Sequence, residues 1–302
     1  MTITDETASK ATQIALEQRQ PTFIEVIVKT YFKQSAFSIL GELLVVLVIV
    51  IGILGPSIAP FDPLAVDMTQ RLQAPNAEHY FGTDELGRDV FSRVLHGGRY
   101  TLITVVFVLS LVVGLGIPVG AIAGYREGWI DEVLMRVADL VLAFPPLVLA
   151  MAMVVAMGPS LTTAMIAVAV VRWPRYARLV RGQVMTYKHR PFVEAALASG
   201  ANNRRILIKH ILPNSLDPVM VRATVDAGFI ILTTASLSFI GLGAQPPIPE
   251  WGSMIASGRR YMIDNWWVGL FPGLAIMIAV SGFVLLGDEI RDRLDPTLRG
   301  RR

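Results

Sequence analysis

Hydrophobic positions gather into long uninterrupted stretches along this chain, instead of the short alternating runs that are typical of half-buried strands. A helix needs about 20 residues to cross a hydrocarbon core of about 30 Å. The stretches therefore predict an all-α integral membrane protein with six transmembrane helices. The candidate spans lie at about 37–59, 101–123, 137–157, 161–180, 223–242 and 266–287.

The third and fourth spans share one uncharged stretch, residues 140–171, which is too long for a single span. Gly158-Pro159-Ser160 divides it, because glycine and proline favour turns, so a hairpin is predicted. Pro145-Pro146 lacks backbone donors and predicts a kink in the third span. Arg172 and Arg175 interrupt the fourth span, and we expect their long side chains to reach the membrane interface.

Composition agrees with a membrane protein. Hydrophobic residues make up 53% of the chain, charged residues only 17%, and the mean hydropathy is +0.54. Soluble domains carry about 25% charged residues. A net charge of +3 lacks the basic excess of a nucleic-acid-binding protein. The absence of cysteine excludes disulfides, zinc–thiolate sites and iron–sulfur clusters.

The distribution of basic residues predicts the orientation. Of the 27 lysines and arginines, 21 lie in the N-terminal segment, the second loop, the fourth loop with its flanks, and the C-terminal tail. Basic segments stay in the cytoplasm, so both termini and the fourth loop are predicted to be cytoplasmic. The predicted parts are a cytoplasmic segment 1–36, a six-span domain 37–290 and a cytoplasmic tail 291–302.

The N-terminal segment leaves two interpretations open. Apolar residues recur with helical spacing over residues 21–34. This pattern predicts either an interfacial helix or a continuation of the first span into the cytosol. We expect no signal peptide, since no short apolar segment with a small-residue cleavage site is visible.

Three ionisable side chains, Glu42, Asp139 and Asp226, lie at or near membrane depth. Such groups are costly in hydrocarbon and face protein or water. Helical spacing predicts local ion pairs between Asp139 and Arg136 and between Asp226 and Arg222. A substrate or proton site is the alternative for both aspartates.

Small residues and prolines mark two further features. Gly116, Gly120 and Gly124 form a flat face of the second span, which serves either packing within the subunit or a subunit interface or pathway. The fifth loop, residues 243–265, is rich in proline and forms either an outer lid or a rigid connection. Trp266 and Trp267 follow it as expected interface anchors.

The fourth loop, residues 175–215, is polar and too short for a domain. Residues 194–199 favour helix, and Gly200 is suited to the left-handed turn that ends one. A second helical segment, residues 203–212, is predicted to end at Pro213. The loop therefore reads as a helix–turn–helix across the membrane face, suited to docking on another protein. No lysine follows a glycine, so the chain has no P-loop.

Several motifs of the chain resemble those of a known protein family. Glu194-Ala195-Ala196, Gly200 and Leu212-Pro213 resemble the EAA loop of permease subunits in binding-protein-dependent ABC importers, although His210 stands where the family has isoleucine. Residues 81–93, 241–252 and 287–296 resemble the dipeptide/oligopeptide/nickel branch, specifically its C-type subunit. The likeness covers the chain from about residue 37 to its end.

The resemblance implies a type I ABC importer permease fold with a cytoplasmic coupling helix over residues 192–203. It implies two sets of site residues. The ATPase-coupling set is Phe192, Glu194, Ala195, Ala196, Gly200, Ala201, Asn203, Leu212 and Pro213. The outer-side set, from loop 60–100 and the fifth loop, is Gly82, Thr83, Asp84, Gly87, Arg88, Asp89, Gln245, Pro246, Pro247, Glu250 and Trp251.

The resemblance also implies an assembly in the bacterial cytoplasmic (inner) membrane. Its partners would be a homologous second permease, two cytoplasmic ATPases that bind ATP and Mg, and an extracytoplasmic substrate-binding protein. This chain itself would be no enzyme and would bind lipid but no cofactor, metal or nucleic acid. The implied solutes are di/oligopeptides, with glutathione and nickel or metal chelates as alternatives. An ion-coupled secondary transporter, a membrane enzyme and a membrane scaffold remain alternatives from the residues alone.

Overall fold

The computed structural model describes residues 36–294, and all regular elements in that range are helices. The expected interfacial helix over 21–34 and the tail from residue 295 lie outside the described residues. The long helices are α3 Ala36–Ile58, α4 Val90–Arg126, α7 Leu161–Lys188, α11 Asp217–Phe239 and α13 Trp267–Leu294. The shorter ones are α5 Gly128–Leu142, α6 Pro146–Met157, α8 Pro191–Ala198, α9 Asn203–Arg205, α10 Leu212–Ser215 and α12 Trp251–Gly258.

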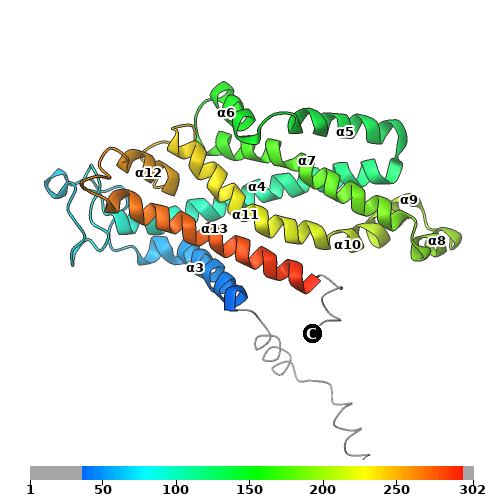
Figure 1. Cartoon of the computed structure of the whole chain (residues 1–302), viewed down its shortest axis with the longest axis horizontal. Coiled ribbons are helices and arrows are strands. Elements are labelled where there is room, and N and C mark those ends of the chain that lie inside the picture. Colours follow the sequence, from blue (N-terminus) through cyan, green and yellow to red (C-terminus); the bar gives the residue numbers. More distant parts are fainter. Residues whose placement is uncertain (1–35, 295–302) are drawn as a thin grey trace, which may run out of the picture. The chain divides into compact units, whose positions relative to one another are not determined.

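Helices α4, α7, α11 and α13 run alongside one another within the unit formed by Leu40–Arg302 (Figure 1). Helix α8 projects at one end of this bundle and α12 lies at the other. Within the described residues, α3, α4, α11 and α13 are long and apolar enough to cross a membrane, and the pair α5–α6 counts as a fifth span when taken together. Helix α7 has sufficient length but carries several arginines, so the predicted count of six stays a prediction.

The hairpin between the third and fourth predicted spans is confirmed. Gly158 has a φ of +91°, a conformation that glycine adopts without strain. Ser160 then caps α7, accepting from the Thr163 backbone N–H at 3.1 Å while Thr163 Oγ1 accepts from the Ser160 N–H. This capping box fixes the start of α7 at Leu161.

The third predicted span, residues 137–157, is wrong as a continuous helix. Helix α5 ends at Leu142, α6 begins at Pro146, and the two axes bend by 88°. Pro145 disfavours helical conformation at the preceding Phe144, and Pro146 cannot donate to a preceding turn. The prolines therefore end one helix and start another instead of kinking one helix.

The second predicted span begins eleven residues earlier than expected, at Val90 instead of Thr101. Asp89 is the reason, because its Oδ2 accepts from the Ser92 N–H at 2.7 Å and so caps the helix. The first outer loop, predicted over 60–100, consequently ends at residue 89. The fifth and sixth predicted spans are close to α11 and α13, which each extend further on their predicted cytoplasmic side.

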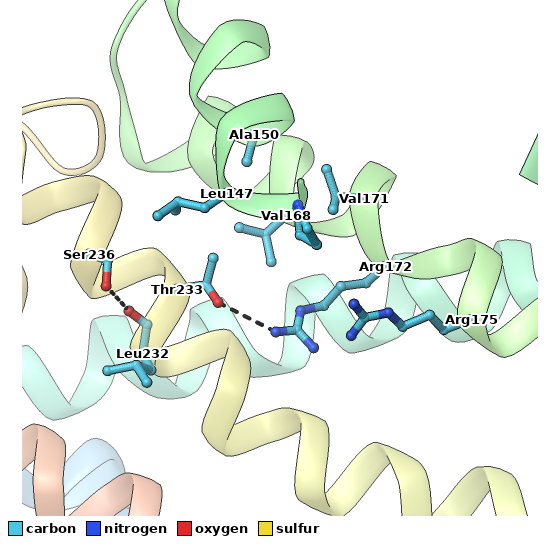
Figure 2. A pocket seen from close by; sticks show the side chains of 10 residues that line it. Leu147, Ala150, Val168, Val171, Arg172, Arg175, Leu232, Thr233 and Ser236 are labelled. Atoms are coloured by element: carbon cyan, nitrogen blue, oxygen red, sulfur yellow. Dashed lines mark hydrogen bonds between the residues drawn. The ribbon is translucent and has the colours of Figure 1, made fainter. Parts of the chain in front are cut away.

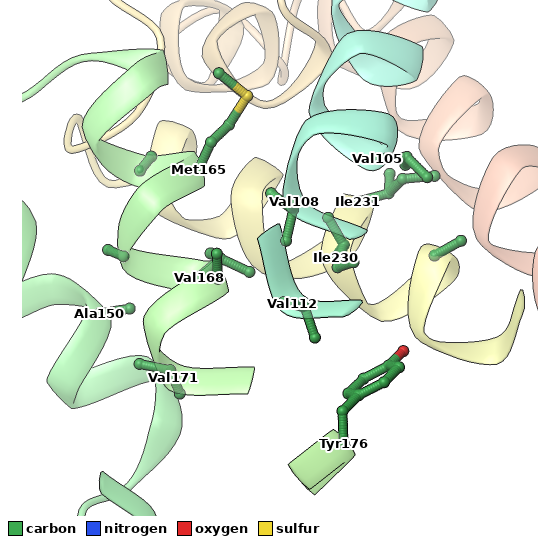
Figure 3. Close-up of a cluster of buried hydrophobic side chains, with 14 of the residues drawn as sticks. Val105, Val108, Val112, Ala150, Met165, Val168, Val171, Tyr176, Ile230 and Ile231 are labelled. Atoms are coloured by element: carbon green, nitrogen blue, oxygen red, sulfur yellow. The ribbon is translucent and has the colours of Figure 1, made fainter. Parts of the chain in front are cut away.

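The core lies where α4, α7 and α11 meet. Gly116, Gly120 and Gly124 face α7, and a Cβ at Gly124 would lie 2.7 Å from the Arg181 carbonyl oxygen. The packing interpretation of this glycine face is therefore confirmed. Beside it lies a cluster of buried side chains, shown in Figure 3, that includes Val105, Val108, Val112, Met165, Val168, Val171, Ile230 and Ile231.

Candidate functional site

Helix α8, Pro191–Ala198, is the projecting helix that the sequence of the fourth loop predicts. Pro191 lies in its first turn, where a missing N–H costs nothing. It ends in a Schellman motif, because the Gly200 N–H donates to Leu197 O at 2.9 Å and the Ala201 N–H donates to Ala196 O at 3.1 Å. Gly200 has a φ of +82°, as the sequence predicted.

The exposed face of α8 is mixed in character. Phe192, Glu194 and Leu197 are exposed, whereas Val193 is buried and anchors the helix to the bundle. The flanking positions Lys188, Arg190, Arg204, Arg205 and Lys209 are basic. An apolar and acidic ridge with basic flanks is suited to insertion into a groove on a partner protein.

The predicted coupling helix over 192–203 is longer than the observed one. Ala201 and Asn203 lie beyond the turn, and Asn203 begins α9. Asn203 Oδ1 accepts a hydrogen bond from the Tyr125 hydroxyl at 3.0 Å, which ties this segment to the end of α4. Asn203 therefore joins the loop to the bundle instead of extending α8.

The prediction that the second segment ends at Pro213 is wrong. A π-helical segment, Ile206–Ile211, leads into α10, and helical conformation continues to Ser215. The Leu212 N–H donates to Leu207 O, the wide turn of a π-helix. Pro213 then lies in the first turn of α10, a position that tolerates its missing N–H.

Ion pairs join the base of α8 to the corner between α4 and α5. Lys188 Nζ lies 2.9 Å from Glu127 Oε1 and donates to Tyr125 O at 3.0 Å. Arg181 binds Asp131 through two hydrogen bonds of 2.6 and 2.5 Å. These partners are 50 to 63 residues apart in the chain, so spacing gave no signal for them. They join the end of α7 that precedes α8 to α5 and to the corner between α4 and α5.

The first outer motif forms a buried polar network. Asp84 Oδ2 accepts from Arg88 Nε at 2.7 Å and lies 3.5 Å from Arg93 Nε. Asp89 Oδ1 lies 2.9 Å from His79 Nδ1. Thr83 Oγ1 accepts from the Gln73 N–H at 2.8 Å. Gly82 and Gly87 have positive φ values, +70° and +72°, that shape the turns around this network. All six predicted residues of this motif are buried, so they hold the loop together.

The second outer motif divides into a buried and an exposed part. Trp251 Nε1 donates to Val94 O at 2.9 Å, and Glu250 caps α12 by accepting from the Ser253 N–H at 2.9 Å. Burial raises the pKa of the Glu250 carboxyl, which hydrogen bonds from the Ser253 and Gly252 backbone partly oppose. The exposed part is Gln245, Pro246 and Pro247.

Of the two tryptophans expected as membrane-interface anchors, Trp267 is wrong, and the role of Trp266 stays a prediction. Trp266 is 51% exposed, but Trp267 is buried, and its Nε1 donates to Thr83 O at 3.1 Å. The first outer loop therefore covers Trp267, which was expected to contact the membrane interface. The fifth loop is thus fixed to the first outer loop at Trp267 and to α4 at Trp251.

The membrane-depth charges are paired, though not all as predicted. Asp226 is 1% exposed and lies 3.1 Å from Arg222, which confirms that pair. Arg172 also binds Asp226, at 3.0 Å, so the expectation that Arg172 reaches the interface is wrong. Asp226, the counter-ion of Arg172, is buried inside the bundle. Glu42 lies 2.8 Å from Arg293.

The predicted pair of Asp139 with Arg136 is also wrong. Arg136 lies 3.4 Å from Glu132, and Asp139 pairs instead with Arg178 of α7. Arg178 is half exposed, and this contact joins α5 to α7. Helical spacing identified the charged residues but not which helix supplies the partner.

A cavity of about 310 Å³ lies among α6, α7 and α11. Arg172 and Arg175 of α7 and Thr233 and Ser236 of α11 form its polar side, while Leu147 belongs to its apolar side (Figure 2). Arg172 Nη2 donates to Thr233 Oγ1 at 3.4 Å. The sequence marked both arginines but gave no indication of the cavity. Within residues 36–294, no group of three or more histidine, aspartate or glutamate side chains could hold a metal ion.

Comparison with known proteins identifies a family and several relatives of this chain. Residues 116–300 match the family described as binding-protein-dependent transport system inner membrane component. The chain is 43% identical to the probable D,D-dipeptide transport system permease protein DdpC of Escherichia coli (strain K12), over 97% of this chain and 99% of that protein. It is 43% identical to the dipeptide transport system permease protein DppC of Alkalihalophilus pseudofirmus, over 88% of each chain.

Two further relatives extend the comparison. The glutathione transport system permease protein GsiD of Pectobacterium atrosepticum is 41% identical over 89% of each chain. A chain of the MetNI methionine ABC transporter in an inward-facing conformation aligns with a TM-score of 0.53 at 20% identity, covering 67% of this chain and 97% of that one. At that identity the structural likeness establishes the fold, which is that of a type I ABC importer permease.

Proposed function

Because the chain belongs to the family of binding-protein-dependent transport system inner membrane components, we propose that this permease subunit serves an importer for dipeptides and short oligopeptides. The observation that carries the proposal is 43% identity along nearly the whole length of a protein named for D,D-dipeptide transport. The names of the other relatives, for dipeptides and for glutathione, also describe short peptides. The family consists of transport components, not enzymes.

Helix α8 provides the proposed link to ATP hydrolysis. Its exposed Phe192, Glu194 and Leu197 would insert into a groove on one of two cytoplasmic ATPase subunits, which bind ATP and Mg. The contacts of Lys188 with Glu127 and Tyr125 would carry movement of α8 to α4, and the Arg181–Asp131 pair would carry it to α5. A homologous second permease completes the membrane part.

The opposite end of the bundle would face the extracytoplasmic binding protein. Gln245, Pro246 and Pro247 are exposed there, while the buried network of Asp84, Arg88 and Asp89 holds the surface in shape. This orientation places α8 and both termini in the cytoplasm. It is supported by the basic residues, since 21 of the 27 lie in the segments predicted to be cytoplasmic.

The experiment begins with the tagged chain purified in mild detergent. We expect a second permease and one or two ATPases to copurify, with measurable ATPase activity. The copurified complex is then placed in proteoliposomes with its binding protein, and uptake of radiolabelled alanyl-alanine is measured with and without ATP. ATP-dependent uptake is the expected result. A single chain without ATPase in several detergents, or uptake that follows an ion gradient alone, would establish a secondary transporter instead.

A further inference from the structure

Three neighbouring cavities follow α11 from its outer to its inner part. The cavity of about 350 Å³ near Phe239 shares Leu147, Leu232 and Ser236 with the cavity of about 310 Å³ described above. That cavity shares Arg175 with a third, of about 690 Å³, which Arg178 and Arg222 also line. The three cavities therefore adjoin one another along α7 and α11, and Arg175 lines two of them.

The middle part of this face has an excess of positive charge. Arg172, Arg175, Arg178 and Arg222 line the two inner cavities. Asp226 is shared by Arg172 and Arg222, and Asp139 pairs with Arg178. Arg175 makes no ion pair with any described residue, and its side chain is exposed to the cavities. Arg175 is thus a cation on this face whose charge no described carboxylate offsets, which favours a role in binding an anion.

The polar residues of the middle cavity lie well inside their helices. Arg172 lies eleven residues after the start of α7, so it is roughly 17 Å along the helix at 1.5 Å per residue. Thr233 lies near the middle of the second half of α11. Figure 2 shows the side chain of Arg172 extending from α7 toward Thr233 of α11, with Arg175 beside it.

We propose that Arg175, together with Arg172, binds the terminal carboxylate of a peptide during its passage through the membrane, while the apolar wall accommodates a side chain. A guanidinium fork matches a carboxylate in geometry and charge. Asp226 holds Arg172 in place from behind, and Thr233 Oγ1 accepts a hydrogen bond from it. The cavity volume of about 310 Å³ lies at the lower end of ligand pockets, which run from about 300 to 1,000 Å³. The inference rests on the proposed function, since it assumes that the solute is a peptide.

The test compares uptake of alanyl-alanine with uptake of its C-terminal amide in proteoliposomes holding the complete importer. Each substrate is measured with the wild-type chain and with Arg175→Gln. Because the same binding protein is present in both cases, its own preference cancels when the acid-to-amide ratio of kcat/KM is compared between the two chains. We expect Arg175→Gln to lower that ratio about tenfold, by loss of a charge-assisted hydrogen bond.

Two more variants make the result specific. Arg175→Lys retains the charge without the fork and should recover part of the ratio; it also serves if Arg175→Gln does not assemble. Arg136→Gln removes an exposed arginine of α5 that pairs with Glu132 and should leave the ratio unchanged. An equal loss of acid and amide uptake, or an unchanged ratio, would overturn the carboxylate site while leaving the importer assignment intact. Absence of ATP-dependent peptide uptake by the wild-type importer would instead overturn the proposed function.

Discussion

Arg172 of α7 and Asp226 of α11 form a buried ion pair of 3.0 Å between residues 54 positions apart in the chain. Arg222 approaches the same carboxylate from its other oxygen, at 3.1 Å. Two cations therefore share one anion where α7 and α11 meet. The pair explains how an arginine is accommodated in the middle of a predicted span, and it positions the polar side of the cavity.

Asp226→Asn should destabilise the subunit strongly. Removing one partner of a buried pair leaves an uncompensated charge, at a cost of about 3–5 kcal/mol. The measurement is the thermal unfolding of the purified complex. Replacing both partners, as in Arg172→Met with Asp226→Leu, should recover most of that loss, because the remaining cation, Arg222, is 40% exposed and is not buried without a partner. A single variant as stable as the wild type would show that the pair does not hold α7 and α11 together.

Local sequence signals located the helices better than they located their partners. The break at Gly158-Pro159-Ser160 and the turn at Gly200 depend only on the conformational preferences of those residues, so both were predictable. Asp139 illustrates the opposite case, because its partner Arg178 lies 39 residues away on another helix. Spacing on one helix favours Arg136 and cannot show that tertiary packing provides a closer cation.

In the candidate site, too, features that depend on local sequence were predictable and features that depend on contacts between helices were not. The exposed residues of α8 were predicted from a motif, and the structure presents Phe192 and Glu194 on its surface. The cavity was not predicted, since it requires Leu147 of α6, Arg175 of α7 and Thr233 of α11 to come together. The outer residues were assigned to a surface near a partner, yet most of them are buried, because a polar motif can stabilise a loop as well as bind a partner.

Gly120→Ala should destabilise the packing of α4 on α7. A Cβ at this position would overlap the Ala177 carbonyl oxygen and lie 2.9 Å from Val180 Cβ. Overpacking of this kind costs about 1–3 kcal/mol. Gly114→Ala is the matched control on the same helix, since no atom lies within 4 Å of its Cβ. That control should stabilise α4 by up to about 1 kcal/mol through helix propensity. Equal melting temperatures for both variants would contradict the close approach of α4 and α7.

Gly200→Val should uncouple ATP hydrolysis from uptake while the chain stays inserted. The φ of +82° costs a residue with a Cβ about 1–2 kcal/mol, so the turn after α8 would shift. No neighbouring atom lies within 4 Å of the added Cβ, so the effect is conformational and not steric. Gly182→Val, in an equally open position inside α7, is the control. Wild-type uptake by Gly200→Val would remove the turn from the coupling assignment.

Glu194→Lys should weaken ATPase docking and stop uptake. Glu194 is exposed in the first turn of α8, where an acidic side chain also interacts favourably with the helix dipole by about 0.3–1 kcal/mol. Copurification of the ATPases and ATP-driven uptake are the two measurements. The control is Glu78→Lys, the same change of charge at an exposed position of the outer loop. If both variants retained their ATPases and transported normally, α8 would not be the docking element.

Glu250 should make the outer end of the bundle more stable at acidic pH. Burial raises the pKa of this carboxyl in the folded protein above its value in the unfolded chain. The folded state therefore binds the proton more tightly, so this contribution is complete below the unfolded pKa and is lost as pH rises through the folded pKa. Thermal unfolding across that interval measures it. Glu250→Gln keeps an oxygen that accepts from the Ser253 N–H but cannot ionise, so its profile should lack this step, whereas the exposed Glu78→Gln should retain it. A step of the same size in Glu250→Gln would assign the pH dependence to another group.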